Sequence, residues 1–235
     1  MLEIIHEDEH LIAINKPAGL LVHRTSIAAE EQSEFAVQKL RDQIGSKVYP
    51  AHRIDRPTSG VLLFAKNPES LPLLKVQFAE RLVSKKYLAL VRGYLSEKEG
   101  RINYPLENER SKKLQEAITD YKVLEKIEIP FDTTGRYPTS RYSLVEMSPL
   151  TGRTHQIRRH LAHLRHYIIG DKKHGNNKQN HFFFTQFGLE NLLLHAYQLE
   201  LQHPWTKQEM SLKASIPDHF RTILTKIEMN SDLIQ

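Results

Sequence analysis

The chain has 235 residues, of which 40% are hydrophobic and 26% are charged, so it can form a substantial globular core. Cysteine is absent, which excludes disulfides and thiolate chemistry, and no apolar run approaches the roughly 18 to 20 residues of a membrane-spanning helix. The formal net charge of +5 at pH 7 favours an acidic partner such as a nucleic acid. Because the N-terminus also lacks a signal-peptide pattern, we expect a cytoplasmic protein without a membrane contact.

The first third of the chain predicts a hairpin, a helix, a buried strand and a second helix. In chain order these are strands at 2–5 and 11–15, a helix over 28–44, a strand at 61–65, and a helical stripe of Leu71, Leu74, Phe78 and Leu82. The strand at 61–65 is apolar at every position, which is typical of a strand covered on both faces.

The remainder of the chain predicts further strands and two helices. These are strands at 86–92, 117–127 and 141–147, a helix over 153–165, a strand pair at 192–201 and 209–214, and a last helix over 218–229. The polar stretches within 107–140 predict long loops on a binding face. Strands and helices do not alternate regularly, which favours an α+β fold with a mixed, mostly antiparallel central sheet flanked by helices and loops.

The stretch HRIDRPTSG, residues 52–60, places one carboxylate between two arginines at the start of the predicted buried strand. Asp55 could be a turn-capping aspartate before Pro57, which is a common role. It could instead be a catalytic carboxylate, since a nearby guanidinium favours the ionised form that a nucleophile or base requires. The stretch alone leaves both interpretations open.

The predicted helix at 153–165 carries an apolar stripe that begins with Ile157, and Arg153 precedes that residue by one helical turn. A guanidinium at the head of a buried stripe needs a carboxylate partner, and Asp55 is the natural candidate. The alternative is that Arg153 points into solvent. Tyr87 shares a face of its strand with apolar neighbours, and periodicity does not distinguish packing from base stacking or proton transfer.

Cofactor signatures are missing from the sequence. The histidines of the 153–165 region do not have the i, i+4 spacing of a zinc motif, so we expect no metal site. Neither GxGxxG nor GxxxxGK[ST] occurs, so we expect no nucleotide cofactor. The segment 151–178 is rich in Lys and Arg and contains one acid, Asp171, which predicts a basic face.

Five motifs together resemble, in order, those of the RluA-type pseudouridine synthases. They are NKPAG (15–19), HRIDRPTSG (52–60), KKYLALVRG (85–93), LTGRTHQIRRHL (150–161) and LLHA (193–196). The resemblance implies the pseudouridine synthase fold, an active-site cleft across its sheet, and isomerisation of an RNA uridine without a cofactor. It also implies a single catalytic domain over 1–235, without the N-terminal S4-type RNA-binding domain of some members, and we expect a monomer.

A finer resemblance concerns the RNA substrate. The stretches GRYPTSRYSLVE (135–146) and RRHLAHLRHYIIGDKKHG (158–175) are similar to those of members that act on uridine 65 of tRNA. An alternative is a member acting on ribosomal RNA, because that group shares the motifs. A non-catalytic RNA-binding module is a further alternative, although such a protein would not need all of the catalytic residues.

The resemblance also suggests a role for each matching residue. Asp55 corresponds to the catalytic aspartate, Arg153 to its ion-pair partner, and Tyr87 to the tyrosine that packs on the target base and is a candidate for removing its C5 proton. Arg53 corresponds to the arginine that enters the space left by the flipped base, and Ile157 lines the pocket. The further substrate-binding candidates are Arg56, Thr58, His155 and Arg158.

Overall fold

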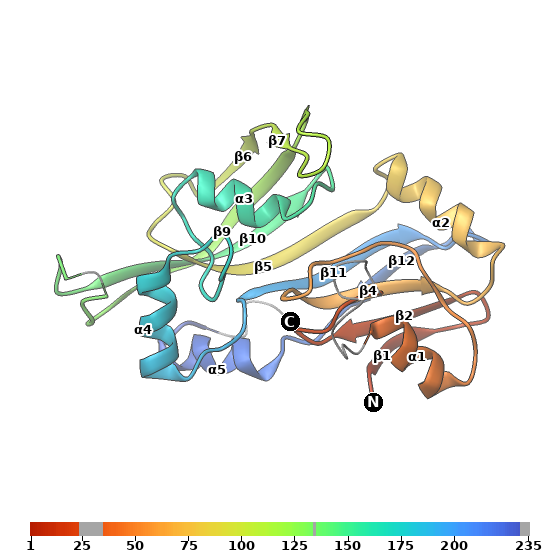
Figure 1. The fold of residues 1–235 in the computed structure, drawn as a ribbon, viewed down its shortest axis with the longest axis horizontal. Coiled ribbons are helices and arrows are strands. Elements are labelled where there is room, and N and C mark those ends of the chain that lie inside the picture. Colours follow the sequence, from red (N-terminus) through yellow and green to blue (C-terminus); the bar gives the residue numbers. More distant parts are fainter. Residues whose placement is uncertain (24–34, 134, 231–235) are drawn as a thin grey trace. The chain divides into compact units, whose positions relative to one another are not determined.

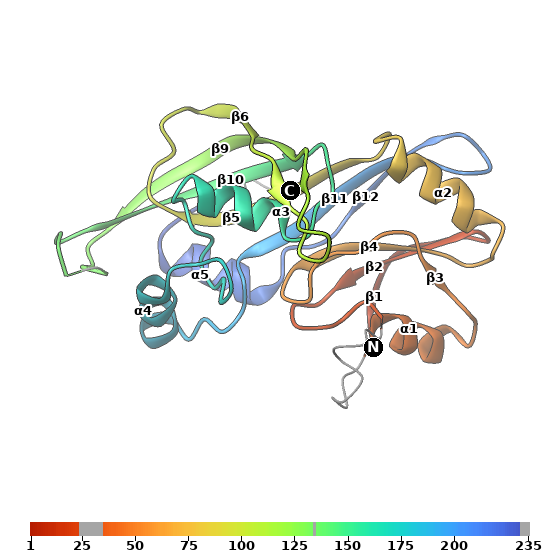
Figure 2. The ribbon, with the colours of Figure 1, turned by 45° about the horizontal axis from the view of Figure 1, so that its top comes forward.

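The computed structural model describes residues 1–23, 35–133 and 135–230, and Figures 1 and 2 show its ribbon. The chain divides into two compact units, each made of two segments. Unit 1 contains Met1–Lys85 and Ala196–Ser215, and unit 2 contains Lys86–His195 and Ile216–Gln235. The prediction of one catalytic domain over 1–235 stays a prediction.

Unit 1 is built on antiparallel strand pairs. Its strands are β1 (Glu3–Glu7), β2 (Leu11–Lys16), β3 (Tyr49–Pro50), β4 (Ser59–Ala65), β12 (Glu209–Lys213), and β11 (Leu194–Gln202) from Ala196 onward. Strand β2 pairs with β1 and β4, β3 pairs with β4, and β11 pairs with β12. Both hairpins expected in this part of the chain, β1–β2 and β11–β12, are therefore confirmed.

Strand β4 is buried at every position because a helix covers each of its faces. Leu62 and Phe64 share a core with Leu40 of α1 (Ala36–Ile44). Leu63, which points to the opposite side, shares a second core with Leu74 of α2 (Ser70–Ala79). The alternation of side chains along the strand thus explains the uninterrupted apolar run, and the prediction of a doubly covered strand is confirmed.

Both unit 1 helices differ in length from the expected ones. The predicted helix over 28–44 is observed as α1 from Ala36, and most of the earlier part of the prediction lies outside the described residues. Helix α2 ends at Ala79, and Arg81 adopts a left-handed backbone conformation with φ of 61°. Leu82, which was expected to lie on the buried stripe, is 62% exposed, because the helix ends before its position is reached.

Unit 2 contains the longer strands. They are β5 (Ser84–Arg92) from Lys86 onward, β6 (Glu99–Asn103), β7 (Leu106–Glu107), β8 (Leu114–Gln115), β9 (Ile118–Ile129) and β10 (Ser140–Pro149). Strand β10 pairs antiparallel with β5 and β9, and β9 pairs with β6. The predicted strands at 86–92, 117–127 and 141–147 are confirmed. Short strands β7 and β8 form a small hairpin in a stretch that was predicted to be a loop.

Among its described residues, unit 2 has three helices, namely α3 (Gln156–His163), α4 (Asn177–Phe187) and α5 (Asp218–Lys226). Helix α3 lies against β9 and β10 (Figures 1 and 2) and buries Ile157 and Leu161 in a core with residues of β5 and β10. The predicted last helix is confirmed as α5. Helix α4 was not predicted because its polar beginning, NKQNH, lacks an apolar period.

The arrangement of strands and helices confirms the α+β class. Within the described ranges, none of the helices combines the length and apolar character that crossing a membrane requires. The cleft across the sheet that the family resemblance implies stays a prediction.

Candidate active site

The candidate residues fall in both units. Those of unit 1 are Arg53, Asp55, Arg56 and Thr58, and those of unit 2 are Tyr87, Arg153, His155, Ile157 and Arg158. The predicted pairing of Asp55 with Arg153 joins residues of different units and stays a prediction.

A buried lysine organises the turn that carries Asp55. Lys16, the last residue of β2, is fully buried, and its Nζ donates hydrogen bonds to the carbonyl oxygens of Pro17 at 2.8 Å, Leu20 at 2.9 Å and Arg56 at 3.1 Å. Burial lowers the pKa of Lys16 to about 7, while the negative charge of Asp55 acts to raise it. Lys16 therefore connects the 17–20 turn to the main chain beside Asp55 and contributes positive potential there.

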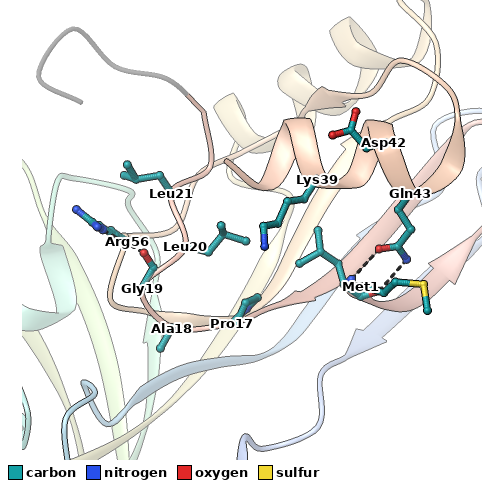
Figure 3. Close-up of a pocket in the computed structure, with 11 residues that line it drawn as sticks. Met1, Pro17, Ala18, Gly19, Leu20, Leu21, Lys39, Asp42, Gln43 and Arg56 are labelled. Atoms are coloured by element: carbon teal, nitrogen blue, oxygen red, sulfur yellow. Dashed lines mark hydrogen bonds between the residues drawn. The ribbon is translucent and has the colours of Figure 1, made fainter. Parts of the chain in front are cut away.

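Arg56 strengthens the same connection. Its Nε donates to the Gly19 oxygen at 3.0 Å, and the Gly19 N–H donates to the Arg56 oxygen at 2.9 Å. These residues border a pocket of about 710 Å³ (Figure 3), to which α1 contributes Lys39. Arg56 thus stabilises its loop, and contact with an RNA phosphate stays a prediction.

Thr58 has an unusual position in this turn. Its N–H donates to the Asp55 oxygen at 3.1 Å, and its side chain is buried, with the residue 2% exposed. The Oγ1 atom has no hydrogen-bond partner among the described residues. A buried hydroxyl without a partner costs about 1 to 3 kcal/mol, which suits a group that is satisfied only when a ligand arrives. Arg53 is exposed and Asp55 is half-buried.

Tyr87 and Ile157 meet in unit 2. Tyr87, on β5, is half-buried and packs against the core that contains Ile157 of α3. Packing thus accounts for the buried part of the tyrosine ring. The contact of Tyr87 with a target base stays a prediction.

The structure corrects the expected environment of Arg153. Helix α3 begins at Gln156, so Arg153 lies in the loop before the helix and not at the head of its apolar stripe. The predicted start of the helix at residue 153 was wrong, because His155 adopts a left-handed conformation, with φ of 54°, that a continuous helix excludes. Arg153 is half-buried, and its Nε donates to the Glu116 oxygen at 2.9 Å.

Gln156 fixes the main chain at Arg153. Its Oε1 accepts the Arg153 N–H at 3.0 Å and the Thr151 hydroxyl at 2.7 Å. Its Nε2 donates to the Ile118 oxygen and to Thr119 Oγ1, both at 2.9 Å. With both donors and two acceptor positions used in a buried setting, Gln156 holds the Arg153 loop against β9.

The expected contact of Arg158 with substrate is not supported by its position. Its Nε and Nη2 each donate to a carboxylate oxygen of Asp171 at 2.7 Å, and the two side chains are only 5% and 1% exposed. Asp171 also accepts the N–H groups of Lys173 and His174. In this structure Arg158 therefore holds the 171–175 loop through Asp171, and its contact with substrate stays a prediction.

His155 meets the same loop. Its Nδ1 lies 2.9 Å from Nε2 of His174, and Lys173 of the loop pairs with Glu109 at 2.8 Å. Burial and the Arg158 charge lower the pKa of His174. Within the described ranges, no cluster of three or more potential metal ligands occurs, at this pair or elsewhere.

The sequence reasoning did not identify three residues that hold parts of the candidate site in place, namely Lys16, Gln156 and Asp171. Each lies inside a motif or basic segment that had been singled out, but attention went to its charged or apolar neighbours. For Asp171 a signal existed, because a lone acid in a basic segment next to a buried helix predicts a partner arginine. For Lys16 and Gln156, no local sequence pattern predicts that the side chain is buried.

Comparison with known proteins gives a consistent result. The sequence pattern of a family described as RNA pseudouridylate synthase matches residues 10–163. A Vibrio parahaemolyticus protein named tRNA pseudouridine synthase C is 47% identical, with 100% of this chain and 98% of that protein covered. A Pasteurella multocida protein of the same name is 48% identical, with 95% of each chain covered.

Solved structures of similar fold are also known. Human RNA pseudouridylate synthase domain containing 4 is 26% identical, with a TM-score of 0.72 over 97% of this chain and 94% of that chain. Human RNA pseudouridylate synthase domain containing 1 is 25% identical, also with a TM-score of 0.72, over 92% and 84% of the two chains.

Proposed function

Since the chain belongs to the RNA pseudouridylate synthase family, we propose that it converts a uridine of tRNA, at position 65, to pseudouridine. The observation that carries the choice of tRNA is similarity over nearly the full length to relatives named tRNA pseudouridine synthase C, at 43% to 48% identity. We also propose that it acts in the cytoplasm and as a monomer.

The reaction breaks the bond between C1′ and N1 of the nucleotide and forms a bond between C1′ and C5. The proton leaves C5 and N1 gains one, so the atoms balance without an oxidant, a reductant or a second substrate. The base must first leave its stack, at a cost of a few kcal/mol. Contacts of basic side chains with phosphates offset that cost.

Asp55 is our candidate for the group that acts on the nucleotide. It either attacks the sugar or the base, or it removes the 2′ proton, and each route needs an ionised carboxylate. The position of Asp55 supports this role, because buried Lys16 interacts electrostatically with it and binds the adjoining Arg56 carbonyl, which holds the turn in place. We propose Arg153 as the ion-pair partner of Asp55, and Tyr87 as the group that packs on the base and removes its C5 proton.

Substrate contacts in this proposal come from side chains that the fold leaves accessible. Arg53 is exposed, so it can enter the space left by the flipped base. The basic loops at 107–113 and 135–141, together with accessible cations of 151–178, are proposed to contact RNA phosphates.

Mapping of pseudouridine tests the proposal. Unmodified tRNA and ribosomal RNA transcripts are incubated with the protein, and pseudouridine is located by chemical adducts that stop a primer extension. The proposal expects a stop at position 65 of tRNA. A signal found only in ribosomal RNA would show that ribosomal RNA, not tRNA, is the substrate. No signal in either RNA would refute the proposed isomerase activity.

A further inference from the structure

Two aromatic rings form a close stack on the surface of unit 2. Tyr104, between β6 and β7, lies over His163 at the end of α3, with a centroid distance of 3.6 Å and an interplanar angle of 17°. A ring in such a stack has one of its two faces covered. Tyr104 is nevertheless 42% exposed, and His163 is also exposed, so much of the pair remains open to solvent.

Hydrogen bonds hold the Tyr104 main chain in place. Its carbonyl oxygen lies 3.0 Å from Nε2 of the fully buried His160, and its N–H donates to the Ala117 oxygen at 3.2 Å. A carbonyl can only accept, so His160 carries its proton on Nε2. Its Nδ1 then accepts the Thr119 hydroxyl at 2.9 Å, and burial lowers the pKa of His160, in keeping with a neutral ring. The main chain that carries the Tyr104 ring is therefore fixed from the protein interior.

The charge around the stack is positive. Arg159 lies one turn before His163 on α3 and uses one of its five N–H donors for the Glu107 oxygen, at 2.9 Å. The two acids of the β7–β8 hairpin, Glu107 and Glu109, are each paired with a lysine. Within the described part of the chain, the hairpin residues Arg110 and Lys113 have no carboxylate partner.

We propose that Tyr104 and His163 form a stacking site for an unpaired nucleobase of the RNA substrate, with Arg159 contacting the adjoining phosphate. Fixed aromatic rings beside uncommitted cations are what single-stranded nucleic acid requires, because every base has a face that can stack. Helix α3 spans eight residues, or about 12 Å. The site therefore lies about one helix length from the Arg153 loop and takes a nucleotide other than the target. This inference rests on the proposed RNA substrate.

A fluorescence titration tests the site without requiring turnover. Tyr104→Trp is made together with Trp205→Phe, so that the new indole is the only one in the chain. The full-length protein is titrated with a short oligoadenylate, which contains no uridine, and with an abasic RNA of the same length. Stacking predicts quenching and tighter binding by the oligoadenylate. Equal responses to both RNAs would overturn the proposal.

Three further variants separate stacking from structural effects. Tyr104→Leu should weaken oligoadenylate binding about 5- to 150-fold, which corresponds to one stacked base, while Tyr104→Phe should retain affinity. Phe184→Leu, which removes another exposed ring of unit 2, should change nothing. Wild-type affinity in Tyr104→Leu with an unchanged melting temperature would refute the site. Because no uridine is present, a failed isomerase assay would leave this result standing.

Discussion

The buried pair of Arg158 and Asp171 yields a prediction that distinguishes a structural arginine from an RNA-binding one. Two hydrogen bonds of 2.7 Å join side chains that are at most 5% exposed. Removing one member of such a pair leaves an uncompensated buried charge and costs about 3 to 5 kcal/mol. We expect Arg158→Met to lower the free energy of unfolding by that amount, and the double variant Arg158→Met/Asp171→Leu to be more stable than the sum of the single changes implies.

Urea denaturation at pH 7 measures these free energies, and acid titration adds an independent check. Burial acts to raise the pKa of Asp171, but its bonds to Arg158 and to backbone N–H groups bring the net value below its ordinary 3.8. The stabilisation is therefore complete above about pH 4 and is lost as pH falls through the lower folded-state value.

Measuring the salt dependence of RNA affinity tests the alternative, in which Arg158 contacts an RNA phosphate. If Arg158 only holds its loop, Arg158→Met should leave the salt dependence of RNA affinity unchanged. Unaltered stability, together with a salt slope reduced by about one, would refute the structural role and restore Arg158 as a phosphate contact.

Three further predictions concern residues around the candidate site. Thr58→Val should raise the free energy of unfolding by about 1 kcal/mol but lower kcat, with Thr58→Ser retaining activity; unchanged kcat would mean that the hydroxyl has no ligand. The pKa of Lys16 is about 7 in the folded chain, against an ordinary value of 10.5. Between these two pH values the lysine is protonated in the unfolded chain but not in the folded chain, so the free energy of unfolding rises with pH over this range. The slope is about 1.4 kcal/mol per pH unit and should be missing in Lys16→Met, as urea titrations at several pH values will show. Gln156→Ala should lower kcat far more than it changes KM, because it releases the Arg153 loop. A lower free energy of unfolding with unchanged kcat would show that Gln156 is a purely structural residue.

The sequence predicted most of the elements of this fold whose periodicity is strong. Strand β4 is an example, because its seven buried residues required cover on both faces. Helix α4 and the β7–β8 hairpin were not predicted, since distant residues hold their polar stretches in place. Gln179 of α4 accepts the Tyr142 hydroxyl, and the Glu107 oxygen of β7 accepts a hydrogen bond from Arg159. Local patterns do not report such long-range support.

The candidate site shows the same division. Asp55 was identified from a motif, but its turn is held by the neighbouring Arg56 together with Lys16, which lies 39 positions before Asp55 (55 − 16). Arg158 was named as a substrate-binding candidate on the family resemblance. Its burial depends on Asp171, thirteen residues later, and only the folded chain shows that the two meet.

The central claim is that this chain isomerises uridine in RNA by means of Asp55. The most direct measurement is release of tritium from tRNA that carries [5-³H]uridine, compared for the wild-type protein and Asp55→Asn. Because the C5 proton leaves in this reaction, the wild-type protein should release tritium, whereas Asp55→Asn should bind tRNA with equal affinity and release none. Release at the wild-type rate by Asp55→Asn, or no release by the wild-type protein, would contradict the claim.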